Sequence, residues 1–296
     1  MNTQSSSRLV FLSFAALTLF IPSRAPAAPV IRSFGGDATT ASVTPIRDTF
    51  RLDIGGGTTP GAAPGSFGTP SLRREINWDG VPATQSAPNN LAANFFNTTS
   101  PRGAVFSTAG TGFQVSGSTL DAGAGQPAAA NFGNINVSYG TTFTVFTAQR
   151  LFTALGSTVT NVNFFIPGTA TAATVAGFGA IFTDVDTAGS TRIEYFNQLD
   201  ASLGVFNVPV GTVANGSLSF LGVSFNAGEK IGRVQITSGN TALGAGVNDN
   251  PGGGVDLVVM DDFIYSEPTP EPSSVLLCAV GITGLLSARR RNQRVS

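Results

Sequence analysis

Apolar and polar side chains alternate in many short stretches between residues 105 and 265 of this chain of 296 residues. In N-V-N-F-F-I-P the apolar residues Val162, Phe164 and Ile166 fall on one face, and in G-F-Q-V-S-G so do Phe113 and Val115. An alternation with a period of two predicts half-buried β-strands. Similar alternation or short apolar runs mark the stretches that begin at Thr141, Phe178, Thr191, Ser217, Arg233 and Val255.

These stretches recur at intervals of roughly ten to sixteen residues, with turn residues between them and no helical periodicity. Many short strands joined by turns predict an all-β fold, an antiparallel β-sandwich of jelly-roll-like type, over residues 71–266. Residues 28–70 are expected to form a loop-rich N-terminal segment, because periodicity is weak there, above all from Gly55 to Gly68.

Charged residues make up only 11% of the chain, against roughly 25% in typical soluble domains. Between residues 28 and 268 sixteen Asp and Glu stand against ten Arg and Lys, a net charge of −6 without a basic stripe. This balance argues against a nucleic-acid partner. The chain has no histidine, and its single cysteine, Cys278, lies in an apolar segment near the C-terminus. Histidine- and cysteine-based catalysis is thereby excluded in the body of the chain, and any metal there must be a hard, oxygen-bound cation.

Residues 1–27 have the parts of a secretory signal peptide. Arg8 supplies the positive charge, Leu9–Ile21 form an apolar run of thirteen residues, and Ala25-Pro26-Ala27 matches the A-x-A cleavage rule. We expect signal peptidase to cut after Ala27. An uncleaved anchor is the alternative, although thirteen residues are short against the about twenty that a membrane span needs.

The segment 267–296 combines a short rigid motif, an apolar stretch and a basic cluster. In order, these parts are Pro270-Glu271-Pro272, a predicted apolar helix over residues 275–288, and a basic tail over 289–294 that includes Arg289, Arg290 and Arg291. Positive charge of this kind holds a tail on the cytoplasmic side of a membrane. An ordinary C-terminal anchor would also use the apolar stretch and the arginines, but it needs no Pro-Glu-Pro.

This arrangement resembles the PEP-CTERM sorting signal of exported Gram-negative bacterial proteins, with Thr269 where the commonest form has valine. The resemblance implies processing by an exosortase, a membrane protease that cuts near the tripeptide. It implies a precursor held in the inner membrane by the C-terminal helix and a mature form at the cell surface or outside the cell. Residues 178–265 are also similar in texture to a sandwich domain of such proteins, which implies a fold and a location but no activity.

Four aspartates are candidate calcium ligands. Asp184 and Asp186 end an apolar stretch, and Asp261 and Asp262 interrupt the last one. Strict alternation places Asp261 and Asp262 on opposite faces of a strand, so at least one of them points inward and needs a partner. The partner could be Arg192, Arg233 or backbone N–H groups, or it could be Ca²⁺, which takes oxygen ligands of this kind. Solvated turn residues are the alternative, since the stretch from Asn248 to Asp256 comes closest to a calcium loop and breaks its spacing.

The stretch R-R-E-I-N-W-D-G-V-P contains the only tryptophan, Trp78, followed by Asp79. An exposed pair of this kind would suit stacking on a sugar ring, but a single tryptophan is more often a core anchor, and the core is the favoured interpretation.

From these features we predict an exported, non-catalytic surface or matrix protein associated with exopolysaccharide. A carbohydrate-binding module of jelly-roll type is the first alternative. A glycan hydrolase is the less favoured one, because the few glutamates of the body lie in no recognisable catalytic context.

Overall fold

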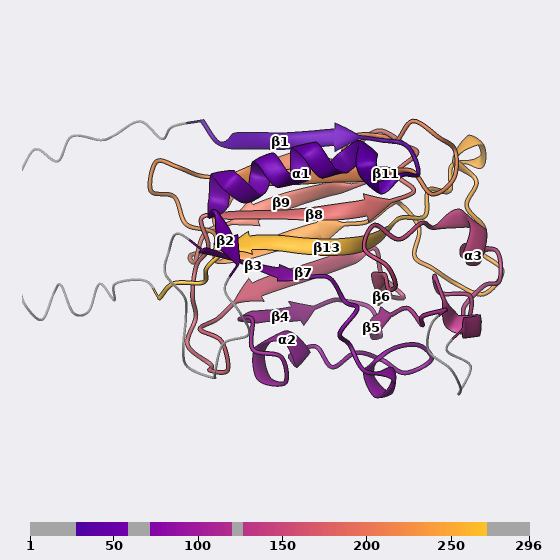
Figure 1. Cartoon of the computed structure of the whole chain (residues 1–296), viewed down its shortest axis with the longest axis horizontal. Coiled ribbons are helices and arrows are strands. Elements are labelled where there is room, and N and C mark those ends of the chain that lie inside the picture. Colours follow the sequence, from indigo (N-terminus) through magenta and orange to yellow (C-terminus); the bar gives the residue numbers. More distant parts are fainter. Residues whose placement is uncertain (1–27, 59–71, 120–126, 271–296) are drawn as a thin grey trace, which may run out of the picture.

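Two β-sheets pack face to face in this computed structural model, which describes residues 28–58, 72–119 and 127–270 (Figure 1). The first sheet has, in order, β1 (Val30–Gly35), β11 (Leu218–Ser224), β8 (Gly177–Thr183), β13 (Val259–Ser266), β3 (Leu72–Ile76) and β2 (Gly57–Thr58). Beside this row, β6 (Phe152–Leu155) pairs with β13, and β5 (Gly112–Val115) pairs with β6. The second sheet has β10 (Ser202–Asn207), β9 (Arg192–Phe196), β12 (Arg233–Thr237), β7 (Val159–Phe164) and β4 (Ala104–Ser107). The strand pairings are antiparallel apart from that of β2 with β3. The predicted all-β sandwich is confirmed at this level.

Aromatic side chains fill the space between the two sheets. Trp78 stacks on Phe152, with 4.1 Å between the ring centroids and 2° between the ring planes. Phe263 meets Trp78 edge-on, and Phe106 lies tilted against it. Full burial of a side chain such as Phe contributes about 1.5–3 kcal/mol, so this aromatic layer supplies much of the force that holds the sheets together.

Most of the predicted strands are present. The stretches around Phe113 and Val162 form β5 and β7, and the later ones form β8, β9, β11, β12 and β13. The strand predicted from Thr141 is wrong, because helix α3 (Tyr139–Thr142) ends there and irregular chain follows. Backbone N–H groups in this irregular part donate to side chains instead of to a neighbouring strand: Thr144 N to Thr183 Oγ1, and Phe146 N to the Asp261 carboxylate.

The loop-rich prediction for residues 28–70 is wrong over 30–58, which form β1, the helix α1 (Thr40–Ile54) and β2. Helix α1 covers the outer face of the first sheet (Figure 1), where its buried Phe50 packs over Gly179 and Gly222. A methyl group on Gly222 would lie 2.7 Å from the Phe50 ring, so these glycines make the room that the helix needs. Pro45 and the threonines of α1 have low helix propensity, and this hid the helix in the sequence pattern.

The described chain begins before β1 and ends after β13 at the same end of the sandwich (Figure 1). Helix α3 and the connections that follow β8 and precede β13 lie at the opposite end, which we call the loop end. The remaining short helices are α2 (Phe95–Thr98), η1 (Ala83–Gln85), η2 (Pro127–Ala129) and η3 (Pro251–Gly253). Within the described ranges no helix is both long and apolar enough to span a membrane.

Candidate functional site

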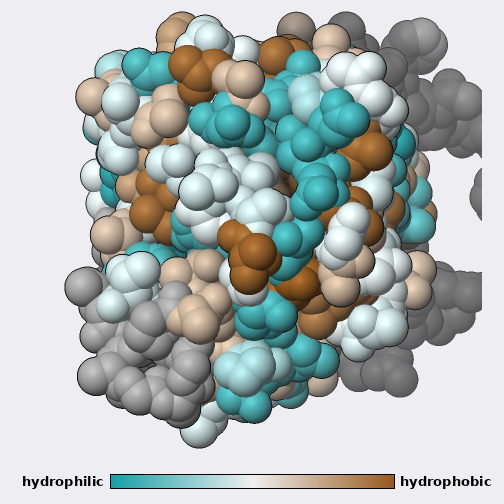
Figure 2. All heavy atoms as spheres, turned by 90° about the vertical axis from the view of Figure 1, so that its right-hand side faces the viewer, coloured by the Kyte–Doolittle hydropathy of each residue, from teal (hydrophilic) through white to brown (hydrophobic). Residues whose placement is uncertain are grey.

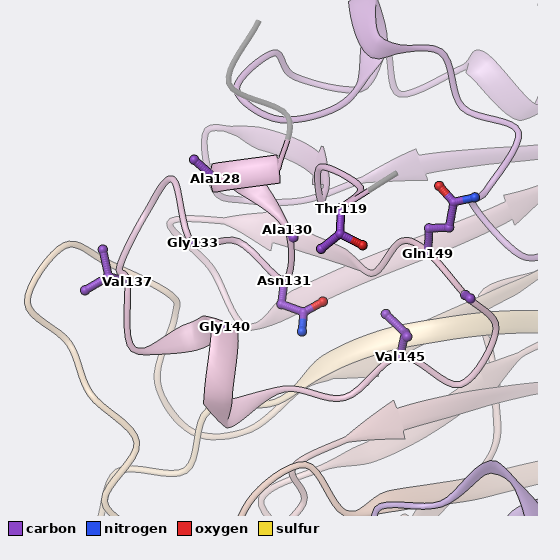
Figure 3. Close-up of a pocket in the computed structure, with 10 residues that line it drawn as sticks. Thr119, Ala128, Ala130, Asn131, Gly133, Val137, Gly140, Val145 and Gln149 are labelled. Atoms are coloured by element: carbon purple, nitrogen blue, oxygen red, sulfur yellow. The ribbon is translucent and has the colours of Figure 1, made fainter. Parts of the chain in front are cut away.

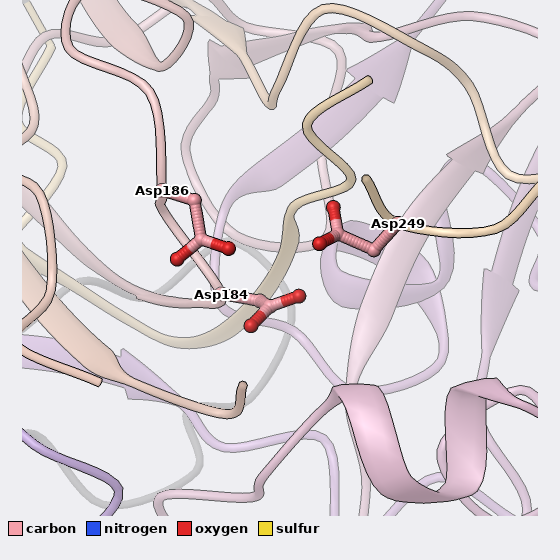
Figure 4. A group of neighbouring side chains, drawn as sticks. All are labelled: Asp184, Asp186 and Asp249. Carbon is pink, nitrogen blue, oxygen red and sulfur yellow. The ribbon is translucent and has the colours of Figure 1, made fainter. Parts of the chain in front are cut away.

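Three carboxylates from two loops meet at the loop end (Figure 4). Asp184 and Asp186 follow β8, and Asp249 lies in the loop that leads to β13. One carboxylate oxygen from each residue lies within 4.8 Å of the others, and the three side chains face a common space. The structure therefore brings Asp184 and Asp186 together and adds Asp249, which sequence reasoning missed.

Backbone N–H groups fix two of these carboxylates. Asp184 has a left-handed φ of 73°, and its Oδ1 accepts a hydrogen bond of 2.8 Å from Gly216 N. Oδ1 of Asp249 accepts one of 2.9 Å from Leu257 N. Oδ2 of Asp184 and Oδ2 of Asp186 are buried and have no hydrogen-bond partner, and Asp184 as a whole is 0% exposed. Buried oxygens without a donor are costly, and they need an explanation.

Burial raises the pKa of each carboxyl in the cluster. Loss of hydration is the main cause, and repulsion by the neighbouring carboxylates adds to it; the pKa of Asp184 rises to about 8 and that of Asp186 to about 6. The pKa of Asp249 is raised in the same way. An oxygen-only set whose charges repel one another can hold a hard cation or share protons.

Asp256 supports the same loop in a different way. Its carboxylate accepts hydrogen bonds from Asp186 N at 3.2 Å, from Thr187 N at 3.1 Å and from the hydroxyl of Ser190. Both of its oxygens are therefore engaged with the segment that carries Asp186. Asp256 is a positioning residue for the cluster.

Asp261 and Asp262 do not join Asp184 and Asp186, so the predicted set of four calcium ligands is wrong. Along β13 the four residues Met260–Phe263 lie opposite only three residues of β8, Ala180–Phe182, which marks a β-bulge. The bulge breaks the alternation, because Met260 and Phe263 both lie in the core between the sheets. Asp261 and Asp262 both turn toward the other face instead of taking opposite faces, since both contact Thr147.

The partners of this pair are donors from the protein itself. Thr147 Oγ1 lies 3.2 Å from Asp261 Oδ1 and 2.9 Å from Asp262 Oδ1, and Phe146 N donates to Asp261 Oδ2 at 2.6 Å. Burial, helped by the adjacent Asp262, raises the pKa of Asp261 well above its usual range. Burial also raises the pKa of Asp262, to about 6.

Trp78 belongs to the core. It is 1% exposed, and its indole Nε1 donates a 2.9 Å hydrogen bond to the backbone oxygen of Asp261, inside the bulge. The favoured interpretation of Trp78 as a core residue is therefore confirmed, and its alternative, stacking on a sugar, is wrong because the side chain is buried against Phe152. Asp79 accepts hydrogen bonds from Gln149 N and Arg150 N, and burial raises its pKa. Asp79 therefore holds the loop at Gln149 and Arg150 in place.

A cavity of about 640 Å³ lies beside η2 and α3 at the loop end (Figure 3). Two of its polar side chains have one atom each engaged within the protein: Asn131 Nδ2 donates to Phe143 O at 2.8 Å, and Gln149 Oε1 accepts from Ser118 Oγ. The described residues that line it include no aromatic ring. Seen end-on, hydrophilic and hydrophobic residues are interspersed over the surface of the loop end (Figure 2).

Of the predicted sorting residues, Pro270 is the last described residue, and Glu271, Pro272, Arg289, Arg290 and Arg291 lie outside the described residues. Glu267, which the sequence assigned to the sorting segment, belongs to the sandwich. It is 2% exposed, and its carboxylate meets the buried Arg74 guanidinium at 2.6 Å. Thr269 also pairs with Thr174, so the folded body reaches at least to this residue.

Comparisons of the chain with known proteins say little about the role of this site. No model of a protein family matches the chain, and no curated protein matches it. Among solved structures, the enzymatically active domain of tailspike protein 4 of bacteriophage CBA120 is similar at 13% identity and a TM-score of 0.26. The match covers 60% of this chain and 20% of that chain. A likeness of this size carries no conclusion about fold or activity.

Proposed function

We propose that this chain is an exported, non-catalytic cell-surface or extracellular-matrix protein that a PEP-CTERM signal sorts and that associates with exopolysaccharide. Signal peptidase and an exosortase-type protease are its processing partners in this proposal. The precursor is held in the inner membrane by the apolar segment over 275–288, and the mature form lies at the cell surface or outside the cell.

The observation that supports the proposal most is how closely the last described strand precedes the tripeptide. The last strand, β13, ends at Ser266, the ion pair of Glu267 with Arg74 follows, and Thr269 makes the last backbone pairing. Pro270-Glu271-Pro272 begins directly after it. A cut at the tripeptide would leave every described strand in place, as a sorting site next to a finished domain requires.

The arrangement of the ends fits the same proposal. The described chain enters and leaves the sandwich at one end, and the other end holds helix α3 and the connections that follow β8 and precede β13 (Figure 1). These connections carry the acidic cluster, and α3 lines part of the cavity. A body tethered through its C-terminal residues would therefore present the loop end away from the membrane. The finer jelly-roll-like assignment of the sandwich is part of this proposal.

Variants of the C-terminal segment test the sorting proposal in a host that carries an exosortase. Glu271→Gln should insert into the membrane like the wild type, because the apolar segment and arginines are intact, yet remain unprocessed. Replacing Arg289, Arg290 and Arg291 by glutamine should weaken the topological stop instead. The measurement is the apparent mass of each variant in the membrane fraction and in the medium.

Glu229→Gln, a change in the body of the chain, is the matched control and should be processed normally. A Glu271→Gln variant that matures like the wild type would show that the segment is an ordinary anchor.

The cavity at the loop end favours a carbohydrate-binding module as the second candidate function. Its amide side chains, Asn131 and Gln149, are groups that hydrogen-bond sugar hydroxyls, although no aromatic platform lies among its described lining residues. Binding of the full chain on a glycan array, without release of product, would favour this alternative. Release of product would favour the hydrolase.

A further inference from the structure

We propose that Asp184, Asp186 and Asp249 form a binding site for one calcium ion. Their carboxylates come from two different loops, and one oxygen from each lies within 4.8 Å of the others (Figure 4). The site goes beyond the proposed surface role, and nothing in the sorting segment is needed for it.

The unpartnered oxygens indicate that the space between the carboxylates takes a ligand. Oδ2 of Asp184 and Oδ2 of Asp186 are buried and accept no hydrogen bond, although other oxygens of the cluster are satisfied by backbone N–H groups. In the part of the chain that the structure describes, none of the three aspartates forms an ion pair with an arginine or lysine. A bound cation would satisfy the orphaned oxygens and cancel the repulsion at once.

The chemistry of the donors selects calcium among cations. The chain has no histidine, and no cysteine occurs in residues 28–58, 72–119 and 127–270, so within this described part ligands that favour zinc or copper are not offered. Ca²⁺ takes 6–8 oxygen ligands in flexible geometry, whereas Mg²⁺ demands a near-ideal octahedron and gives up its water reluctantly. Carboxylates from irregular loops suit the first ion better. Water molecules would complete the coordination.

The position of the cluster gives the ion a structural role. Asp184 and Asp186 follow β8, Asp249 is fixed to Leu257 just before β13, and Gly216, which binds Asp184, precedes β11. The strands β11, β8 and β13 are neighbours in the first sheet. A calcium ion here would join three connections at the loop end and hold them in register.

The test uses the full chain purified in detergent, after removal of metal with a chelator. Calorimetric titration with CaCl₂ should show one ion per chain. Thermal scans should show a rise in melting temperature of about 5–10 °C at calcium one hundred times above its Kd, and MgCl₂ at the same concentration should give a much smaller rise.

Asparagine variants separate binding from folding. Asp184→Asn and Asp249→Asn keep an oxygen that can accept from Gly216 N or Leu257 N, so both should fold without metal and lose the response to calcium. Asp200→Asn, which removes a carboxylate that is 69% exposed, is the control and should respond like the wild type. An unchanged melting curve with calcium, or an equal response to magnesium, would overturn the proposal. A calcium response kept in both cluster variants would overturn it too.

Discussion

The hydroxyl of Thr147 faces the carboxyls of Asp261 and Asp262, and burial, followed by the closeness of the two groups, sets how this pair ionises. Two buried carboxylates side by side repel each other, so the folded protein favours a state in which the pair holds a proton. The bulge in β13 creates the pair, because it turns both residues to one face. It also leaves the Asp261 backbone oxygen for the Trp78 indole. The only tryptophan and the only adjacent pair of aspartates are thus parts of one arrangement.

The pair predicts that the folded protein loses stability as the pH rises. The folded-state pKa of Asp262 is about 6 and that of Asp261 is raised further, whereas an unfolded aspartate has a pKa of about 3.9. The stabilising contribution is therefore fully present below about pH 4 and is lost as the pH rises through about 6, by about 1–3 kcal/mol for Asp262. Urea unfolding at several pH values, with calcium held constant, measures this slope.

The variant Asp262→Asn removes one titrating group and keeps an acceptor for Thr147. Its unfolding free energy should depend less steeply on pH than that of the wild type. Asp200→Asn should leave the slope unchanged, and equal slopes in all three proteins would contradict the role given to the pair.

At the scale of residues, the sequence shows which residue types are present but not which side chains meet in the folded chain. Asp184 and Asp186 are separated by one residue in the chain, so their association could be predicted. Asp249 lies more than sixty residues further on, and only the meeting of two loops brings it near them. The one sequence signal was the Asn248–Asp256 stretch, whose spacing fits no known calcium loop. The position of Asp261 and Asp262 could not be predicted, because a bulge leaves no mark in an alternating pattern.

At the scale of elements, helix α1 depends on a groove in the first sheet. Gly179 and Gly222 lie opposite each other in β8 and β11, and Phe50 occupies the space that side chains would fill. Val43 and Ile54 extend the same contact along the helix. The strands could be predicted from their alternation, but the helix could not, since its packing is set by glycines that are about 130 and 170 residues away in the sequence.

A methyl group in this groove should displace α1. Gly222→Ala puts a carbon 2.7 Å from the Phe50 ring and 2.9 Å from Phe220, and overpacking of this kind costs about 1–3 kcal/mol. Urea unfolding of the variant gives the loss. Gly80→Ala, where the added carbon meets nothing within 4 Å, is the matched control. Combining Gly222→Ala with Phe50→Leu should recover part of the loss, and no recovery would place the clash elsewhere.

At the scale of the whole molecule, the C-terminal part of the body closes the first sheet. Strand β13 lies between β8 and β3 and also pairs with β6. The buried ion pair of Arg74 with Glu267 then joins the end of the folded chain to β3. Strands β8 and β3 are thus connected through β13, whose residues come much later in the chain.

Truncation should therefore have a sharp limit. Residues 28–270 should unfold cooperatively in urea, because all described elements are present. Ending the chain at Ser266 removes Glu267 and leaves the buried Arg74 charge unpaired, at a cost of about 3–5 kcal/mol. Ending it at Val258 removes β13 and should abolish the cooperative transition. A cooperative transition in the shortest form would show that β13 is dispensable.

The central place of β13 also sets the order of events during synthesis. A chain delivered from its N-terminus supplies β13 after β8 and β3, so these two strands lack their shared neighbour until residues 259–266 arrive. Folding that depends on such distant pairings is slow, and under the sorting proposal this delay would keep the chain unfolded during translocation. The first sheet can therefore form only after residues 259–266 have been delivered. Under the sorting proposal, the protease cuts near the tripeptide, a few residues beyond β13. Its substrates are then only chains whose last strand has already been delivered.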